Sequence, residues 1–389
     1  MMSSISRRWQ LISAAAALCL ATVTGCSGTD SPAAISGYSG PIGTIDLKSV
    51  CPAKVVIQTD WNPEAEHGGF YELLGPDPVI DAAGKKVSGP LFAHGQYTGV
   101  DVEIRAGGPA IGSQTVTSQM YQDQSIMLGL VDSDTSIQSA ATTPTTGVFA
   151  PFDKSPLMIM WDPATYPNAH AIADLKTAGA TVLYFQGATY MDYLTGAGLL
   201  NKSQVDGSYD GTPANFVAAG GKKAQQGYIS SEPYLYEQKI AQWHKPVAYQ
   251  LVHDTGFQAY KGALSVRSGQ LESQAACLQR LVPVLQRAEV DYVADPSRVD
   301  ALIVQAVDKF DTGWVYDQGN AAFALQHMRS DGVIAGSGTL GGFDTARLQH
   351  LIDITKPIFA AQKVTVPQGI TPEQVATNRF IDPKIGLTS

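Results

Sequence analysis

Basic residues are scarce in this sequence, and none of them are clustered. Lys and Arg number 26, against 35 Asp and Glu, so the 389-residue chain carries a formal net charge of −9. Nucleic-acid binding depends on grouped Lys and Arg side chains that replace the counterions of the phosphates. We therefore predict that the protein does not bind nucleic acid.

The common motifs of catalysis and metal binding are also missing. The sequence has no C-x-x-C or H-E-x-x-H pattern for zinc, no G-x-S-x-G nucleophile elbow and no phosphate-binding G-x-x-x-x-G-K-[ST] loop. The 7 histidines are scattered, and no reacting partner can be named for any of them. We predict a protein that is not an enzyme and that has no metal site and no cofactor.

Long apolar runs are absent except at the start of the chain. Arg7 and Arg8 precede an apolar run over residues 11–23, which is followed by Thr24, Gly25 and Cys26. The run is shorter than the roughly 20 apolar residues of a membrane-spanning helix. This order predicts an export signal over residues 1–25 that is removed.

Residues 23–26, Val-Thr-Gly-Cys, resemble a bacterial lipobox, which implies that Cys26 carries the lipid. The alternative is an ordinary signal peptide with an incidental cysteine. Residues 26–41 are rich in Ser, Gly and Ala without an apolar period, and this composition predicts a flexible tether. We expect an exported protein, anchored by lipid to the outer face of the cytoplasmic membrane.

Cysteine is rare, with 4 residues in the chain. Cys19 would leave with the signal and Cys26 would carry lipid, so Cys51 and Cys277 remain. In an exported protein two remaining cysteines favour one disulfide across a very long loop. Two free buried thiols are the alternative.

Short apolar segments alternate with amphipathic ones along the rest of the chain. We predict strands at residues 54–60, 100–105 and 126–131, with a helix at 114–122, which is the order of a largely parallel sheet. Residues 73–97 form a turn-rich insert, either a functional loop or a surface decoration.

The pattern then restarts and produces a second α/β unit, before four helices between residues 271 and 359. We predict an α/β, two-lobed periplasmic-binding-protein fold of type II, in which each lobe is a mostly parallel sheet flanked by helices. Residues 42–150 and 247–389 form lobe 1, and residues 151–246 form lobe 2. Ligand would lie at the carboxyl ends of the strands, between lobes that close about a hinge.

Residues 60–71, Asp-Trp-Asn-Pro-Glu-Ala-Glu-His-Gly-Gly-Phe-Tyr, resemble a signature of the nitrate, sulfonate and taurine group of ABC substrate-binding proteins. They are most similar to D-W-x-P-N-x-x-H-x-G-x-Y of the branch that binds thiamine-pyrimidine precursors, with Glu64 in place of the Asn. Further similarities occur at residues 154–157, 210–213 and 232–233.

The resemblance implies a monomeric solute-binding component of an ABC importer, with an ABC permease and its ATPase as partners. Its small-molecule ligand would be a planar nitrogen heterocycle, such as a thiamine-pyrimidine precursor. An aliphatic sulfonate or taurine is the alternative, for which Arg105 is the one nearby cation. An enzyme acting on a small heterocycle is a further alternative.

Candidate ligand contacts follow from side-chain chemistry and position. An indole stacks on a planar ring, carboxylates accept hydrogen bonds, and a helix start attracts oxygen atoms. We expect a chain crossing between the lobes near residues 231–232. The alternatives are core packing for the indole, a solvated turn for the Asp at residue 132, and a hinge salt bridge for the Glu at residue 232. The predicted contacts are Asp60, Trp61, Glu66, His67, Asp132, Ser133, Gln186, Gly187, Thr189, Tyr190, Ser231 and Glu232.

Overall fold

The computed structural model describes residues 37–334 and 338–387. The predicted signal, the lipid site Cys26 and residues 26–36 of the predicted tether lie outside the described residues. In the part that is described, no helix is long and apolar enough to cross a membrane.

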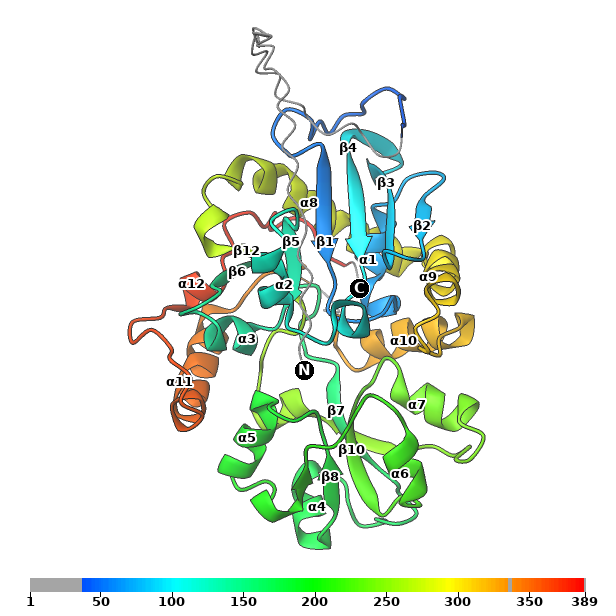
Figure 1. Ribbon diagram of the computed structural model, residues 1–389, viewed down its shortest axis with the longest axis vertical. Helices are drawn as coiled ribbons and strands as arrows, with labels where there is room; N and C mark the ends of the chain where they lie inside the picture. The colour runs from blue at the N-terminus through cyan, green and yellow to red at the C-terminus, as the bar shows by residue number, and fades with distance from the viewer. Residues whose placement is uncertain (1–36, 335–337, 388–389) are drawn as a thin grey trace, which may run out of the picture. The chain divides into compact units, whose positions relative to one another are not determined.

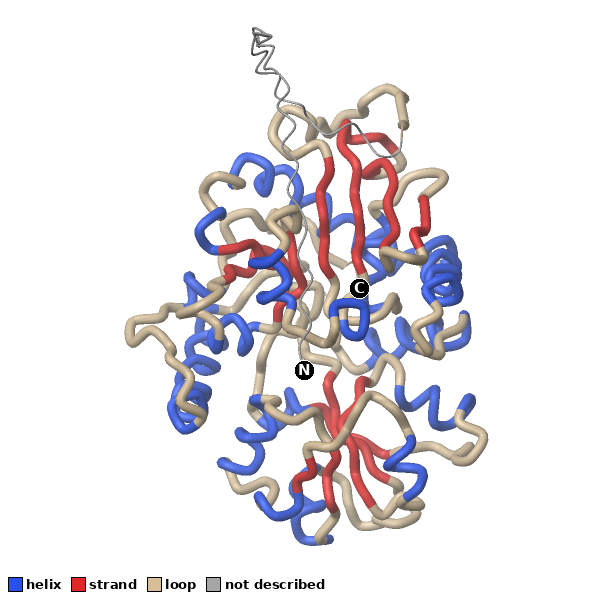
Figure 2. Tube along the Cα trace, viewed as in Figure 1, coloured by secondary structure: helices blue, strands red, loops and turns tan. Residues whose placement is uncertain are grey.

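Two β-sheets organise the described chain, and Figure 2 shows them as two separate groups of strands. The first sheet has the order β2 (Val79–Asp81), β3 (Lys86–Ala93), β4 (Gln96–Arg105), β1 (Lys54–Gln58), β5 (Leu128–Val131), β12 (Ala263–Arg267) and β6 (Thr145–Phe149). The second has the order β11 (Ala248–Leu251), β7 (Leu157–Trp161), β10 (Lys223–Tyr228), β8 (Thr181–Leu183) and β9 (Val205–Asp206).

Helices flank both sheets (Figure 1). Lobe 1 carries α1 (Gly68–Glu72), α2 (Val116–Gln122), α3 (Ser133–Gln138), α8 (Ala275–Ala294), α9 (Ser297–Phe310), α10 (Gln318–Ser330), α11 (Thr345–Ala361) and α12 (Pro372–Val375). Lobe 2 carries α4 (Ile172–Ala178), α5 (Thr189–Gly196), α6 (Ala214–Ala218) and α7 (Glu232–Tyr234). The predicted α/β fold with two helix-flanked sheets is confirmed.

Both sheets are mixed rather than mostly parallel. β1 pairs in parallel with β4 and β5, and β8 pairs in parallel with β10 and β9. The other pairings are antiparallel, partly because β12 enters the first sheet only after the chain has returned from the second. The predicted parallel arrangement therefore holds for β4, β1 and β5 in the first sheet and for β10, β8 and β9 in the second. It does not hold for the other strands of either sheet.

The turn-rich insert at residues 73–97 is part of the first sheet and not a loop. It forms β2, β3 and the start of β4, paired antiparallel. His94 and Gly95 alone connect β3 to β4, with φ of 49° and 69°. Two successive residues with positive φ are what a tight two-residue hairpin requires. The sequence signal for the hairpin was this His-Gly pair.

The chain crosses between the sheets twice, after β6 and after β11. The second crossing therefore follows Leu251 and not residues 231–232. Residues 248–251, which the predicted boundary assigned to lobe 1, pair with β7 in the second sheet. Helix α11 packs against both α3 and α5, so that one lobe 1 helix also contacts lobe 2.

The predicted disulfide is confirmed between Cys51 and Cys277. It joins the segment before β1 to the first turn of α8, across a sequence separation of 226 residues. Closing a loop of this length restricts the unfolded chain, and such a bond typically adds about 2–4 kcal/mol of stability.

Candidate functional site

A cavity of about 120 Å³ lies between the two lobes. Its lobe 1 wall comes from the segment after β1, from the loop just before β12 and from the loop between α9 and α10. Its lobe 2 wall comes from the loops that follow β8, β9 and β10. The lining residues are Asp60, Trp61, Glu64, Glu66, Phe185, Tyr209, Gly211, Tyr228, Ser231, Glu232, Lys261 and Trp314.

The segment after β1 is fixed in place by contacts distant in sequence. The Ala65 amide donates to the Tyr316 hydroxyl at 2.8 Å, and the Thr312 hydroxyl donates to the Asn62 side-chain carbonyl at 2.9 Å. From lobe 2, the Ser230 hydroxyl donates to the Glu66 carboxylate. The acidic segment is therefore held rigidly at the carboxyl end of β1.

Aromatic rings form much of the cavity wall. Trp61 and Trp314 meet edge to face, with centroids 6.1 Å apart at 89°. Phe185 from lobe 2 lies 6.4 Å from the Trp61 ring and 4.8 Å from Tyr209. Rings arranged in this way offer flat apolar faces to a planar molecule.

Two glycines make room for the Trp61 indole. Gly108 has φ +54°, and a Cβ there would lie 2.5 Å from the indole carbon Cε3. Gly211 has φ +87°, and from lobe 2 a Cβ there would lie 3.6 Å from the indole. A side chain at either position would be strained by the positive φ, and at Gly108 it would also clash with the ring.

One ammonium is bound by two carboxylates at the edge of the cavity. Lys261 Nζ lies 2.5 Å from Asp60 Oδ2 and 3.3 Å from Asp132 Oδ1, and His67 Nε2 lies 3.0 Å from Asp60 Oδ1. Burial acts to raise the pKa of Asp60, but the Lys261 charge and the His67 hydrogen bond outweigh it and hold the pKa below its usual range. Burial acts to lower the pKa of Lys261, but the two carboxylates raise it well above its usual value.

Three further carboxyls line the same cavity without an ion pair to any described residue: Glu64, Glu66 and Glu232. Glu232 accepts from the Tyr228 amide at 2.7 Å and from the Tyr209 hydroxyl at 3.4 Å. Glu64, 8% exposed, accepts no hydrogen bond from the described residues.

The surroundings of these carboxyls favour their neutral forms. Burial raises the pKa of Glu232 to about 7. Burial and the Glu66 charge raise the pKa of Glu64 well above its usual value, and burial also raises the pKa of Glu66.

Two polar atoms in the cavity wall lack partners among the described residues. They are Ser231 Oγ and Trp314 Nε1, and both are buried. A buried hydroxyl or N–H without a hydrogen bond costs about 1–3 kcal/mol. A bound molecule with suitable acceptors would remove that cost.

A second chamber of about 290 Å³ adjoins the first and shares Phe185, Tyr228 and Lys261 with it. Its wall is more polar. The Tyr190 hydroxyl donates to the Gln226 side chain at 2.8 Å, and burial with the neighbouring Asp132 charge raises the pKa of Asp134 to about 7.

The structure brings most of the predicted contacts to these chambers. Asp60, Trp61, Glu66, Ser231 and Glu232 line the first chamber, and Asp132, Gln186, Gly187, Thr189 and Tyr190 line the second.

Two predicted contacts line neither chamber. His67 is buried behind Asp60, and the Ser133 hydroxyl accepts from the Tyr260 amide at 2.8 Å. Arg105, the predicted cation for a sulfonate, pairs instead with Glu103 and Asp123, at 2.7 Å each.

Sequence reasoning missed several lining residues. Glu64 stood in the motif but was not selected, and its signal was the departure from Asn. The other missed residues are Phe185, Tyr209, Gly211, Tyr228, Lys261 and Trp314. Of these, Lys261 had a usable signal, because it stands just before the apolar residues that open β12.

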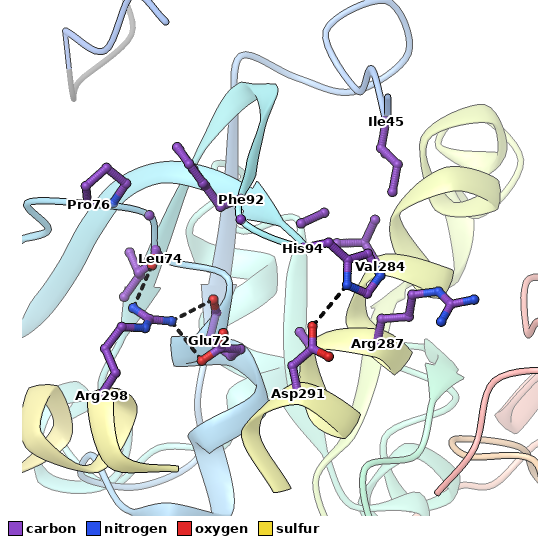
Figure 3. A pocket seen from close by; sticks show the side chains of 14 residues that line it. Ile45, Glu72, Leu74, Pro76, Phe92, His94, Val284, Arg287, Asp291 and Arg298 are labelled. Carbon is purple, nitrogen blue, oxygen red and sulfur yellow. Dashed lines mark hydrogen bonds and ion pairs between the residues drawn. The ribbon is translucent and has the colours of Figure 1, made fainter. Parts of the chain in front are cut away.

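A separate cavity of about 360 Å³ lies within lobe 1 (Figure 3). Its charged side chains largely pair with one another: Arg298 lies 2.8 Å from Glu72, and His94 lies 3.3 Å from Asp291. Much of the rest of its wall is apolar. In this cavity, called the lobe 1 cavity below, both acids have a basic partner, whereas Arg287 has no ion pair among the described residues.

Within the described ranges 37–334 and 338–387, no group of three or more His, Cys, Asp or Glu side chains is arranged to hold a metal ion.

Comparison with known proteins identifies the fold through structure alone. No protein-family model matches the sequence, and no curated protein is significantly similar to it. The periplasmic aliphatic sulphonate binding protein SsuA from Escherichia coli superposes with a TM-score of 0.55 at 17% identity, over 87% of this chain and 95% of that one. A putative sulfonate ABC transporter periplasmic binding protein from Methylobacillus flagellatus KT superposes with a TM-score of 0.52 at 15% identity, over 84% and 92%. The chain therefore has the two-lobed α/β fold of periplasmic binding proteins.

Proposed function

We propose that this protein is the extracytoplasmic solute-binding component of an ABC importer. The observation that carries the proposal is the interlobe cavity, which has aromatic walls and, among the described residues, three carboxyls outside any ion pair and two polar atoms without partners. Binding sites are typically apolar hollows with a few convergent polar groups. The structural neighbours named above are periplasmic binding proteins, which is consistent with this role.

Closure of the lobes around the solute would provide the transport step. Lobe contacts already exist across the cleft: the Asn320 side-chain amide donates to the Ser230 carbonyl at 3.1 Å, and Trp61 lies beside Phe185. A permease with its ATPase would recognise the closed monomer. Export by the signal at residues 1–25 and lipidation of Cys26 would hold the protein at the outer face of the cytoplasmic membrane.

We propose a planar, nitrogen-containing ring as the ligand, for example a thiamine-pyrimidine precursor. Trp61, Trp314 and Phe185 provide faces for stacking, and the carboxyls accept hydrogen bonds from ring or exocyclic N–H groups. The size of the first chamber suits one ring, since an engineered apolar cavity of roughly 150 Å³ binds benzene.

A sulfonate is the second candidate, because both structural neighbours are named as sulfonate-binding proteins. Of the described residues, Lys261 is the one cation in the chamber wall, and it is already bound by Asp60 and Asp132. The three remaining carboxyls would oppose an anion. The ring is therefore the better match to this cavity.

The test is a thermal-shift screen of the full-length chain against pyrimidines, other heterocycles, sulfonates, nitrate and amino acids. A ligand at a hundred times its Kd adds about 2.7 kcal/mol of apparent stability, which raises the melting midpoint. We expect a heterocycle to do so without being consumed, and Trp61→Ala to remove most of the effect. If only sulfonates raise the midpoint, the ring assignment is wrong, and if the compound is converted to product, the protein is an enzyme.

A further inference from the structure

Among the described residues, the cleft holds more carboxyls than basic side chains that could pair with them. Five ionisable side chains apart from tyrosines line the first chamber, and four of them are carboxyls. Lys261 and His67 both bind Asp60, and Lys261 also reaches Asp132 outside this chamber. Glu64, Glu66 and Glu232 are left with no basic side chain within ion-pair distance among the described residues.

The hydrogen bonds of these three acids leave acceptor capacity unused. Glu232 takes two protein donors and Glu66 takes the Ser230 hydroxyl, whereas Glu64 takes none from the described residues. A carboxylate has about four lone-pair positions. The chamber therefore has room for several N–H donors from a bound molecule, mainly at Glu64 and Glu66.

A second, independent observation places the bound molecule here. The Ser231 hydroxyl lines the same chamber, is 2% exposed as a residue, and has no hydrogen-bond partner among the described side chains and backbone. Buried hydroxyls nearly always have a partner. Ser231 is therefore a polar group that a ligand would satisfy.

The aromatic walls add to the preference for positive charge. Ring faces attract cations, by about 0.5–2 kcal/mol per contact depending on desolvation, and recognition of ammonium groups by aromatic cages uses this attraction. Trp61, Trp314, Phe185 and Tyr209 surround the chamber that contains the acids. A neutral ring would gain stacking and hydrogen bonds but no attraction of charge, whereas an anion would be disfavoured by both the acids and the faces.

We propose that the ligand binds as a planar organic cation of the amidinium type, such as a protonated amino-substituted ring, with N–H groups directed at Glu64 and Glu66. The inference rests on the proposed function and narrows the class of its ligand. The cation supplies the charge that the protein does not, and Ser231 binds an acceptor or a further N–H on the same molecule.

The test uses isosteric probes that differ in charge. Calorimetric titration of the full-length chain compares benzamidine, which is a planar cation, with benzamide, which is neutral and has the same shape, and with benzoate and benzenesulfonate, which are anions. We expect benzamidine to bind at least about tenfold tighter than benzamide, and neither anion to bind. Benzamide within threefold of benzamidine, or an anion bound more tightly, would overturn the proposal.

A variant pair assigns the charge preference to the chamber. Glu64→Gln should reduce the ratio of benzamidine to benzamide affinity about tenfold. Glu289→Gln is the matched control, since Glu289 is a buried acid on α8 that does not line the chamber and whose pKa burial raises to about 8. It should leave the ratio unchanged. An unchanged ratio in Glu64→Gln would also overturn the proposal.

The same titrations separate this inference from the proposed function. One outcome is that a neutral pyrimidine binds, that Trp61→Ala weakens its binding, and that benzamidine binds no more tightly than benzamide. In that case the solute-binding function stands and the cation inference fails. If no compound of either panel binds, both fail.

Discussion

The interlobe cavity and the lobe 1 cavity differ in how their charges are balanced. In the lobe 1 cavity, Arg298 pairs with Glu72 and His94 pairs with Asp291 (Figure 3). In the interlobe cavity, Glu64, Glu66 and Glu232 have no counter-ion from the described residues. The lobe 1 cavity is the larger of the two. The interlobe cavity is therefore distinguished by buried carboxyls without a basic partner among the described residues, and not by its volume.

Removing the Lys261 ammonium, the one cation in the chamber wall among the described residues, should produce the largest change in the free energy of unfolding. Lys261→Met leaves Asp60 buried without its ammonium partner, and breaking a buried pair in this way costs about 3–5 kcal/mol. Urea unfolding at pH 7 measures the loss, which should shrink at acidic pH as Asp60 takes up a proton.

Lys154→Met is the control, since its ammonium lies 3.4 Å from a more exposed carboxylate of Asp254. It should lose much less. A similar loss in both variants would show that burial of the Lys261 pair does not matter.

The pH dependence of the ligand-free protein should reveal the unbalanced acids. The pKa of Glu232 is raised to about 7 in the folded state, above its value in the unfolded chain. Both states are protonated at low pH, and as pH rises the unfolded chain releases its proton first, so the free energy of unfolding falls from about pH 4.5 through pH 7. Glu232→Gln should remove about 2–3 kcal/mol of that fall.

Urea unfolding at several pH values between 5 and 8 measures this slope. The comparison variant is Asp291→Asn, in the lobe 1 cavity, where the carboxylate is 40% exposed and faces His94. It should leave the slope nearly as in the parent protein. A slope that Glu232→Gln does not change would contradict the burial argument.

Truncating one aromatic wall in each cavity tests where the ligand binds. Trp61→Ala should weaken binding of the ligand that thermal shift identifies by about 2 kcal/mol, roughly thirty-fold in Kd, because the variant lacks a large ring face. Phe92→Ala, in the lobe 1 cavity, should leave Kd unchanged. Calorimetric titration distinguishes the two, and the reverse pattern would assign binding to the lobe 1 cavity.

The smallest effect is expected for the exposed pair of the lobe 1 cavity. The Arg298 side chain is 50% exposed, and surface ion pairs contribute about 0–1 kcal/mol. Arg298→Ala should lower stability by less than about 1 kcal/mol and leave ligand affinity within twofold. A larger loss of affinity would show that ligand binding in the interlobe cavity is energetically coupled to the lobe 1 cavity.

Local signals in the sequence predicted most of the elements. The buried run of β1, the strand β7 at residues 157–161 and the long apolar periods of α8 and α9 were recognisable because each buries a continuous apolar face. The β3–β4 hairpin was not predicted, since its connection uses His94 rather than one of the usual Asn-Gly or Asp-Gly pairs. The antiparallel position of β12 depends on the chain's return from the second sheet, which no local pattern encodes.

The candidate site was predictable where it lay in one segment. Asp60, Trp61 and Glu66 belong to a single motif after β1 and do line the cavity. Lys261 and Trp314 are contributed from 200 or more positions further along the chain, and only the fold brings them to the same hollow. Arg105, the candidate cation for a sulfonate, pairs with Glu103 and Asp123 and lines neither chamber.

If the protein is held by its N-terminus, as proposed, the Cys51–Cys277 bond has a mechanical consequence. A pull transmitted through residues 37–50 reaches Cys51 before it reaches β1, and the disulfide transfers part of the load directly to α8. β1 cannot then be peeled from the sheet one hydrogen bond at a time, because α8 must move with it. Lobe 1 therefore takes up the tension as one body, and lobe 2 stays free to move on its two crossings.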